Sequence, residues 1–104
     1  ARLRPLLAAH EATGVLVVAP AGEDEGDLAV RMFFEAHGIR EDAATGSANA
    51  GLAALLRSTG FTGRLEIVQG LEIGRPARLH LEVEPEAIAL GGAVWPVYAG
   101  AFGL

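Results

Sequence analysis

The sequence predicts an α+β fold in which a mostly antiparallel sheet surrounds one central helix. Segments typical of strands occur on both sides of a single long helical segment, and they do not alternate with helices as a parallel sheet would require. That segment, residues 45–59, has no charged side chain before Arg57 and is small or apolar on every side, which is typical of a buried helix. A curved sheet wrapped around it would bury all of it.

Composition limits the classes of protein to consider. The 104 residues suffice for one domain at most, residues 1–104, and 51% of them are hydrophobic, as in globular proteins. The formal net charge of −5 argues against a nucleic-acid or anionic-membrane surface. There is no cysteine, which excludes disulfides and thiolate nucleophiles and is compatible with the cytoplasm. With no signal-peptide pattern and no long apolar span, we expect a soluble cytoplasmic protein.

The segments before the central helix predict a short helix and two strands. Residues 2–12 have leucines at helical spacing, and residues 15–19 form a β-branched run typical of a strand buried on both faces. An acidic loop, residues 21–27, is expected to be solvated. Residues 28–35 alternate in a strand pattern, and residues 36–44 are expected to form the connection into the helix.

Two strands are predicted directly after the helix, which should stop at Gly60. They are residues 64–69 and residues 78–84. The second alternates cleanly, and its inward positions are Leu79, Leu81 and Val83. His80 is then expected on the surface.

The last part of the chain predicts a hairpin. Residues 87–90 form a short strand, and Gly91-Gly92 is typical of a tight turn into a final strand, residues 93–102. Trp95 and Tyr98 in that strand are expected to pack in the core and at its rim.

Chemistry-bearing side chains are concentrated in residues 41–49, EDAATGSAN, which also open the central helix. The first backbone N–H groups of a helix lack partners within it, and the macrodipole is positive at that end. Thr45, Gly46 and Ser47 therefore form a place where a carboxylate or phosphate can bind. Asp42 stands just before it and would lie beside the ligand.

Two alternative interpretations of this stretch are open to test. Asp, Thr and Ser before a helix are ordinary N-cap residues, so the stretch is also typical of a capped helix start with no ligand. A nucleotide phosphate loop would need a lysine after Gly46, and none is present. The three histidines are far apart in the sequence, so no metal site is expected.

Three ordered motifs carry a resemblance to a known family. Residues 31–34 (RMFF) and 38–48 (GIREDAATGSA) resemble the R-x-F … G-I-x-E-D-P-A-T-G-S-A signature of the PhzF-like isomerase family, named for phenazine biosynthesis. Residues 69–76 (QGLEIGRP) resemble its Q-G-x-x-M-G-R-P, and residues 90–94 with Gly100 resemble its closing V-G-G-x-V … G. Ala43 replaces the usual proline and Ala77 a common serine.

The resemblance implies a fold and an incomplete site. Proteins of this family have two similar domains, each a barrel-like sheet around a central helix as in diaminopimelate epimerase, with the active site between them. The chain resembles the C-terminal domain. The glutamate of the family's Ser-Glu-Thr stretch and the histidine of its Gly-His-Ala-Thr stretch belong to the other half, and neither motif occurs here. A partner is therefore expected, either a complementary N-terminal half or a second copy.

The implied activity is cofactor-independent proton transfer on a small carboxylate-bearing substrate. Asp42 is then the candidate general acid/base, and Thr45, Gly46 and Ser47 are the candidate substrate-binding residues. Related epimerases of the same fold use paired thiols, which this chain cannot supply. The alternative is a non-catalytic anion-binding or assembly module of the same fold.

Overall fold

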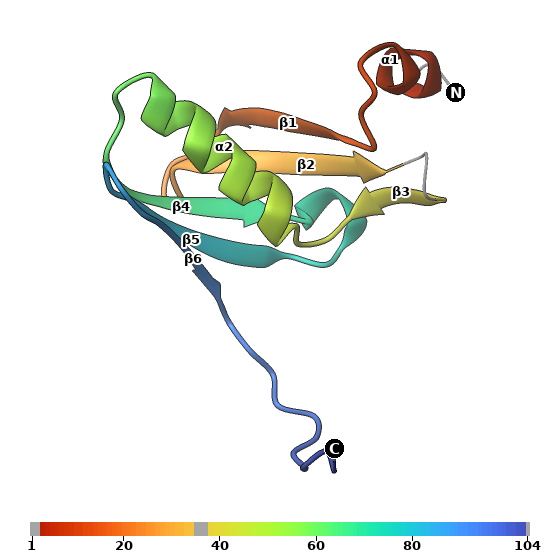
Figure 1. Cartoon of the computed structure of the whole chain (residues 1–104), viewed down its shortest axis with the longest axis vertical. Helices are drawn as coiled ribbons and strands as arrows, with labels where there is room; N and C mark the ends of the chain where they lie inside the picture. The colour runs from red at the N-terminus through yellow and green to blue at the C-terminus, as the bar shows by residue number, and fades with distance from the viewer. Residues whose placement is uncertain (1–2, 35–37, 104) are drawn as a thin grey trace.

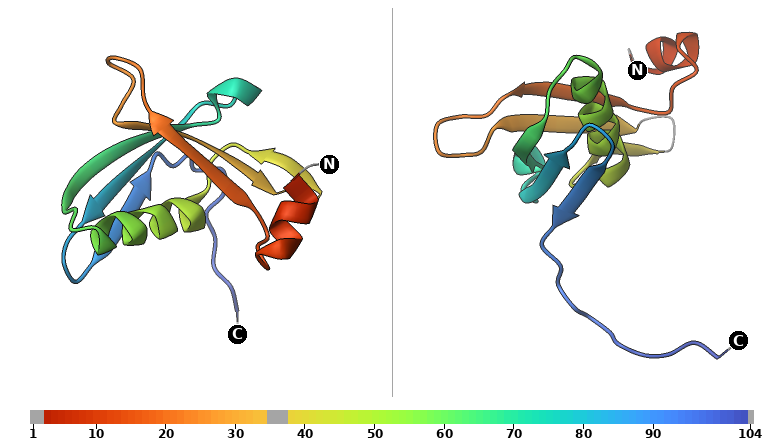
Figure 2. Two further views of the ribbon diagram at one scale, coloured as in Figure 1. Left: turned by 90° about the horizontal axis from the view of Figure 1, so that it is seen from above. Right: turned by 60° about the vertical axis from the view of Figure 1, so that its left-hand side comes forward.

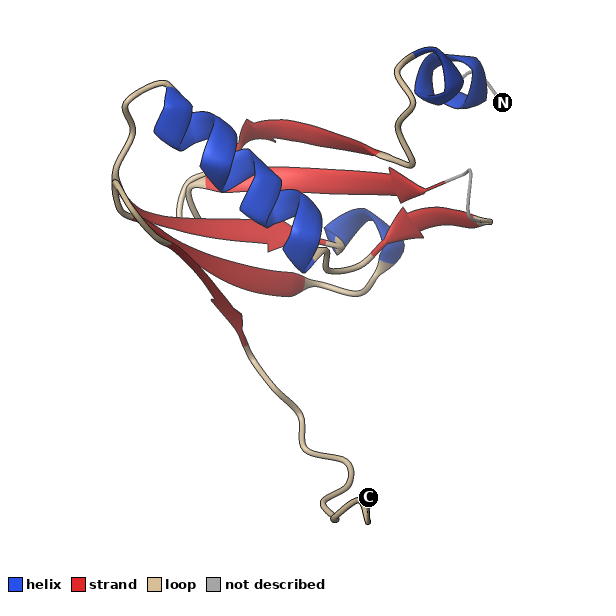
Figure 3. Cartoon of the chain, viewed as in Figure 1, coloured by secondary structure: helices blue, strands red, loops and turns tan. Residues whose placement is uncertain are grey.

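A curved six-stranded sheet carries one long helix on one of its faces (Figures 1 and 3). The structure is a computed structural model that describes residues 3–34 and 38–103. In chain order its elements are α1 (Leu3–Ala9), β1 (Val15–Pro20), β2 (Leu28–Phe34), β3 (Ile39–Asp42), α2 (Gly46–Ser58), β4 (Gly63–Gln69), the 3₁₀ helix η2 (Leu71–Ile73), β5 (Ala77–Val83) and β6 (Ile88–Gly92).

The strand order is β1-β2-β4-β5-β6, with β3 paired to β2 off this path. All pairings are antiparallel except that of β2 with β4, in which Leu28 is opposite Ile67 and Val30 is opposite Gln69. Parallel neighbours need a crossover connection, and α2 lies within it. The predicted α+β class with a mostly antiparallel sheet is confirmed, and α2 lies on one face of that sheet.

Two strands, β3 and β4, pair with different parts of the same edge of β2, and the candidate site lies where they meet. β1 occupies the other edge along almost the whole of β2. On the shared edge β4 pairs with residues 28–30, and β3 pairs farther along, with Met32 opposite Asp42 and Phe34 opposite Ile39. The last residues of β4 and β3, Gln69 and Asp42, therefore meet end to end.

The core lies between the sheet and α2. Side chains alternate between the two faces of a strand, and directly paired residues share a face, so Ile67 with Leu79 and Leu65 with Leu81 point toward the helix. The buried hydrophobic cluster consists of Val30, Ala53, Ile67, Leu79, Leu81 and Val83. The predicted inward set on β5 is confirmed.

The opposite face of β4 and β5 is polar and charged, apart from the buried Val68. Arg64 forms an ion pair with Glu82 at 3.0 Å, and Arg78 forms one with Glu66 at 2.9 Å. His80 is exposed on this face, as predicted. Such exposed pairs contribute little to stability, so the core side of the sheet determines the fold.

The prediction that α2 is buried on every side is wrong. Its side away from the sheet is exposed and consists of small residues and one leucine, namely Ser47, Gly51, Ala54, Leu55 and Ser58. Leu55 is 63% exposed. In the described part of the chain the sheet covers only the side of α2 that carries Asn49 and Ala53.

The prediction that the first strand is buried on both faces is also wrong. Among the described strands β1 lies at the edge of the sheet beside β2, and its last four residues are exposed. Val17 and Val18 point to opposite faces, and both are among the exposed large hydrophobics. β-Branched composition indicated a strand but could not indicate its position at the sheet edge.

β3 was not predicted, because the connection assigned to residues 36–44 contains it. Its four residues, IRED, are too few and too polar to show a strand pattern. Residues 36 and 37 of that connection lie outside the described residues, as do Arg2 and Glu35 of the predicted first helix and second strand.

The predicted C-terminal hairpin is wrong. Gly91 and Gly92 continue β6 in register with β5, with Gly92 opposite Leu79, and neither has the positive φ that a tight hairpin turn needs. The C-terminal segment, residues 93–103, has no regular structure and leaves the sheet (Figure 2). Trp95 is 88% exposed and Tyr98 is similarly exposed, so neither packs in the core.

The first helix is shorter than the predicted residues 2–12. α1 spans Leu3–Ala9, and only Leu7 is buried while Leu6 is exposed. Within the described ranges, no helix is long and apolar enough to cross a membrane.

Two paired leucines provide a test of the core. Leu81 and Leu90 are opposite each other on β5 and β6, but Leu81 is 1% exposed and Leu90 is 40% exposed. We expect Leu81→Ala to lower the free energy of unfolding by about 2–5 kcal/mol, because it leaves a cavity in the core. Leu90→Ala should cost less than half as much. Urea titrations of the two variants measure the difference, and equal costs would contradict the placement of the core.

Candidate functional site

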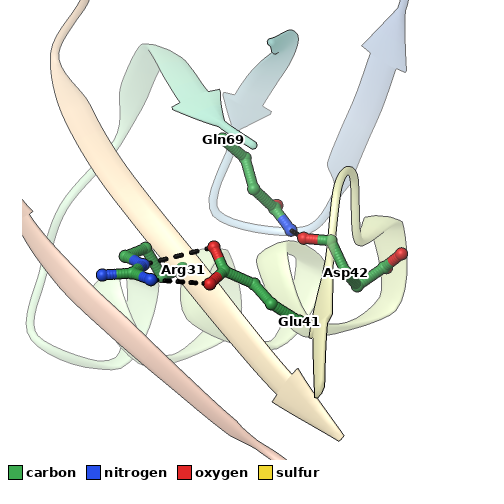
Figure 4. Close-up of polar contacts among 4 residues, drawn as sticks. All are labelled: Arg31, Glu41, Asp42 and Gln69. Carbon is green, nitrogen blue, oxygen red and sulfur yellow. Dashed lines mark hydrogen bonds and ion pairs between the residues drawn. The ribbon is translucent and has the colours of Figure 1, made fainter. Parts of the chain in front are cut away.

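The candidate site lies where β3 ends and α2 begins. Asp42 is the last residue of β3, and Thr45 is the N-cap residue of α2, with extended backbone angles (φ −121°, ψ 99°). Asp42 is opposite Met32, whose side chain is buried on the helix side of the sheet. Figure 4 shows that the side chains of Glu41 and Asp42 point in different directions.

Glu41 anchors β3 to β2 through a two-pronged ion pair. Arg31 donates from Nε to Glu41 Oε2 at 3.2 Å and from Nη2 to Oε1 at 2.6 Å (Figure 4). The Glu41 side chain is only 7% exposed, and the guanidinium also lies 5.2 Å from the centroid of the Phe33 ring. The hydrogen bond with Glu41 raises the pKa of Arg31. This pair fixes which way the neighbouring Asp42 faces.

Both carboxylate oxygens of Asp42 accept hydrogen bonds from the loop. The backbone N–H of Ala43 donates to Oδ1 at 3.0 Å, and the hydroxyl of Thr45 donates to Oδ2 at 2.6 Å. A proline at position 43 would have no N–H to donate, so the alanine supplies a contact that the family's usual residue lacks. Each oxygen keeps a second lone pair, so Asp42 can still accept a proton or a further hydrogen bond.

Gln69 connects the two ends of the loop, Asp42 and Thr45, through hydrogen bonds. Its Oε1 accepts from Thr45 N at 3.2 Å and from Asn49 Nδ2 at 3.1 Å. Its Nε2 donates to Asp42 O at 3.0 Å and to Thr45 Oγ1 at 2.9 Å. Gln69 is 1% exposed, so these bonds are shielded from water.

Asn49 extends this network into the first turn of α2. Its Nδ2 donates to Thr45 O at 2.7 Å, while its Oδ1 has no hydrogen-bond partner among the described residues. Asn49 is fully buried. The buried amides of Gln69 and Asn49 thus hold the backbone of Thr45 from both sides.

Gly70 lets the following loop approach the site closely. Its φ is +83°, and a Cβ at this position would lie 2.7 Å from Ala43 O and closer still to Arg75 O. Arg75 N also donates to Gly70 O at 2.9 Å, which closes the loop around η2. The loop of residues 70–75 therefore supports the segment between Asp42 and Thr45.

The helix start is not capped by the side chain of Thr45. That hydroxyl makes no capping hydrogen bond; its oxygen accepts from Gln69 Nε2 and its hydrogen is donated to Asp42. The amide of Thr45 is used by Gln69, and the first intrahelical bond runs from Asn49 N to Thr45 O. The amides of Gly46, Ser47 and Ala48 precede that bond, so they are the donors that a ligand at this helix end would meet.

The four residues predicted from the sequence lie together, but they differ in access. Thr45 is buried, Asp42 and Gly46 are half-buried, and Ser47 is exposed. A nearby hollow of about 630 Å³ is lined by Ala44, Val68, Pro76 and Arg78 among others, but not by Asp42. The described ranges contain no group of three or more His, Asp or Glu side chains that could hold a metal ion.

Sequence reasoning missed Gln69 and Asn49 as part of the site. Gln69 belongs to a motif that was noted without a role, and it occupies an inward position on a strand whose neighbours at such positions are apolar. Asn49 is the one polar residue on the buried side of α2. The sequence signal for both residues was a polar side chain at a position where the pattern of inward residues is otherwise apolar.

Comparisons with known proteins show the family of the chain. Residues 3–99 match the sequence model of the family described as Phenazine biosynthesis-like protein. The chain belongs to this family. The resemblance seen in its three motifs is thereby confirmed.

Two curated relatives are similar to parts of the chain. The trans-2,3-dihydro-3-hydroxyanthranilate isomerase of Pseudomonas aeruginosa is 49% identical over 57 residues, which are 52% of this chain and 20% of that protein. An uncharacterized isomerase of Pasteurella multocida is 44% identical over 80 residues, which are 74% of this chain and 28% of that protein.

A solved structure of this family has the same fold. The phenazine biosynthesis protein PhzF family member of Enterococcus faecalis superimposes with a TM-score of 0.58 at 28% identity, covering 81% of this chain and 34% of that one. The chain thus spans roughly a fifth to a third of the length of the family members it matches.

Two glycines of the supporting loop provide a test of its contact with the site. Gly70 and Gly74 both have positive φ, so alanine strains the backbone at either position, but a Cβ at Gly74 would meet nothing within 4 Å. We expect Gly70→Ala to cost about 1–3 kcal/mol more than Gly74→Ala, because it must displace the carbonyls of Ala43 and Arg75. Thermal melts measure the difference, and equal melting temperatures would show that the loop does not press against the site.

Proposed function

We propose that this chain is the C-terminal half of a PhzF-like isomerase that moves a proton on a small carboxylate-bearing substrate. The observation that carries the proposal is the position of the Asp42 carboxylate, 2.6 Å from the Thr45 hydroxyl at the start of α2. A proton acceptor and a set of anion-binding amides are thereby within one short loop. The relatives named as hydroxyanthranilate isomerases support the reaction class.

In this proposal Asp42 is the general acid/base. Such an isomerisation breaks one C–H bond, forms another at a different carbon and shifts the double bonds between them, so it consumes no electron donor or acceptor. Asp42 accepts or returns the migrating proton through the free lone pairs of its carboxylate. The hydrogen bonds from Ala43 and Thr45 hold that carboxylate in one orientation.

Gly46 and Ser47 bind the substrate carboxylate in this proposal. Their amides are unpaired within the helix and lie at its positive end, and the Ser47 hydroxyl is exposed. Thr45, the third candidate substrate-binding residue, has its amide and its hydroxyl hydrogen engaged inside the protein. We therefore assign Thr45 to the orientation of Asp42.

A second domain is proposed to complete the site. Asp42 is half-buried and Ser47 is exposed, and the family's glutamate and histidine motifs are absent from this sequence. The C-terminal segment exposes Val94, Trp95, Val97, Tyr98 and Phe102. A contiguous apolar segment of this kind is typical of a surface that another protein part covers. A complementary N-terminal half or a second copy fits this requirement, and only the former supplies the missing glutamate and histidine.

The first test of the proposal is hydrogen exchange on a carboxylate substrate in heavy water. With the N-terminal half present, Asp42→Asn should lower deuterium incorporation by roughly a hundredfold or more, because it removes the proton acceptor. Asp24→Asn is the control, since Asp24 is exposed in the β1–β2 loop. Mass spectrometry of the substrate gives the rate.

Two outcomes would contradict this proposal. Undiminished exchange in Asp42→Asn would remove Asp42 from the reaction. Ligand binding without any exchange by the unmodified protein would favour the non-catalytic anion-binding or assembly module instead.

The second test concerns the partner. We expect the isolated chain to associate in light scattering, and a chain shortened to end at Gly92 to associate much less, because β6 stays complete while the exposed apolar side chains are removed. Addition of the N-terminal half should restore activity only to the longer form. A long form that remains monomeric at high concentration would contradict the role given to the C-terminal segment.

A further inference from the structure

Gln69 uses its full hydrogen-bonding capacity inside the protein. A glutamine side chain has two donor hydrogens and an oxygen with two lone pairs, and all four are used. Two of its partners are backbone groups of fixed character. Thr45 N can only donate and Asp42 O can only accept, so Oε1 must face the former and Nε2 the latter. The backbone therefore dictates the orientation of the amide.

This orientation also determines the direction of the next hydrogen bond. Thr45 Oγ1 lies 2.9 Å from Gln69 Nε2 and must accept from it. The single hydrogen of that hydroxyl is then available only for Asp42 Oδ2, 2.6 Å away. A chain of bonds runs from Gln69 through Thr45 to Asp42, and each step has one possible polarity.

We propose that Gln69 is a positioning residue that acts through the Thr45 hydroxyl to hold the Asp42 carboxylate in its working orientation. This role rests on the proposed function of Asp42. The same role accounts for the motif of residues 69–76, since Gly70 lies against the backbone of Ala43 in the same loop. Gln69 itself is buried and does not touch the substrate.

A change of one atom separates this role from simple packing. Gln69→Glu keeps the shape and the acceptor for Thr45 N, but it replaces the donor Nε2 by an oxygen. The Thr45 hydroxyl would then donate to the new carboxylate and leave Asp42. Gln69→Met keeps a similar length but removes the acceptor for Thr45 N as well.

The first measurement is amide hydrogen exchange at Thr45 in the isolated chain. Protection should persist in Gln69→Glu and be lost in Gln69→Met, because only the second variant lacks the acceptor. Equal protection in all three proteins would overturn the proposed contact. This measurement needs no substrate, so it stands apart from the proposed activity.

The second measurement is a double-mutant cycle in the assembly with its N-terminal half. Gln69→Glu and Thr45→Val should each lower kcat roughly ten- to hundredfold, as expected for a lost hydrogen bond to a charged group, with a smaller effect on KM. The double variant should be no worse than the poorer single variant, because both act through one hydroxyl. Thr45→Ser keeps the hydroxyl and should lose less activity than Thr45→Val.

The control is Val83→Ala, which weakens the core at the far end of β5 without touching the loop. It should lower the melting temperature while leaving kcat of the folded protein unchanged. Multiplicative losses in the double variant, or a Gln69→Glu variant as active as the parent, would overturn the positioning role. If Gln69→Glu does not fold, Gln69→Met replaces it in the cycle, since it also lacks the donor that fixes the direction of the Thr45 hydroxyl.

The failure of the two proposals can be told apart. An assembly that shows no exchange on any carboxylate substrate, but whose Thr45 amide responds as expected, would refute the isomerase function and leave the contact in place. An active assembly in which Asp42→Asn is inactive and Gln69→Glu is unaffected would refute only the role of Gln69.

Discussion

The parallel pairing of β2 with β4 is the constraint on which the rest of the structure depends. It uses only the first part of β2, from Leu28 to Val30, and leaves the remainder of that edge to β3. The crossover that it requires carries α2 over the sheet. In consequence the ends of β3 and β4 and the start of α2 converge, which is why residues as distant in sequence as Asp42 and Gln69 share hydrogen bonds.

The sequence allowed prediction of those parts of the fold that depend on local patterns. The alternation of β5 and the glycine after α2 gave these elements almost to the residue, and Asp42, Thr45, Gly46 and Ser47 were predicted together because they are neighbours in the chain. β3 could not be predicted, because its stability comes from its pairing with β2 and from the Arg31–Glu41 ion pair. The hairpin turn predicted at Gly91 and Gly92 was wrong, because glycine permits a turn without requiring one.

At the start of α2 the Thr45 hydroxyl contacts Asp42 and Gln69 and does not cap the helix. An N-cap threonine ordinarily accepts a hydrogen bond from the first turn, but the Thr45 hydroxyl oxygen accepts from Gln69 instead, and its hydrogen is donated to Asp42. The helix thus forgoes a stabilising contact at its first turn. The buried amides of Gln69 and Asn49 offset this by holding the backbone of Thr45 from within the protein.

The short contact between β2 and β4 also bears on how the chain folds. β1 with β2 and β4 with β5 are antiparallel neighbours joined by short connections, so each pair brings together residues that are close in sequence. The ladder between β2 and β4 has three residue pairs, Leu28–Ile67, Ala29–Val68 and Val30–Gln69, which are far apart in the chain, and hydrogen bonds between Asp27 and Glu66 extend it. Because loop-closure entropy opposes contacts between residues that are far apart in the chain, we expect this union to form more slowly than either hairpin. Separation of β2 from β4 would also part Gln69 from Asp42 while each hairpin kept its own pairing. The site therefore exists only while the two hairpins are docked.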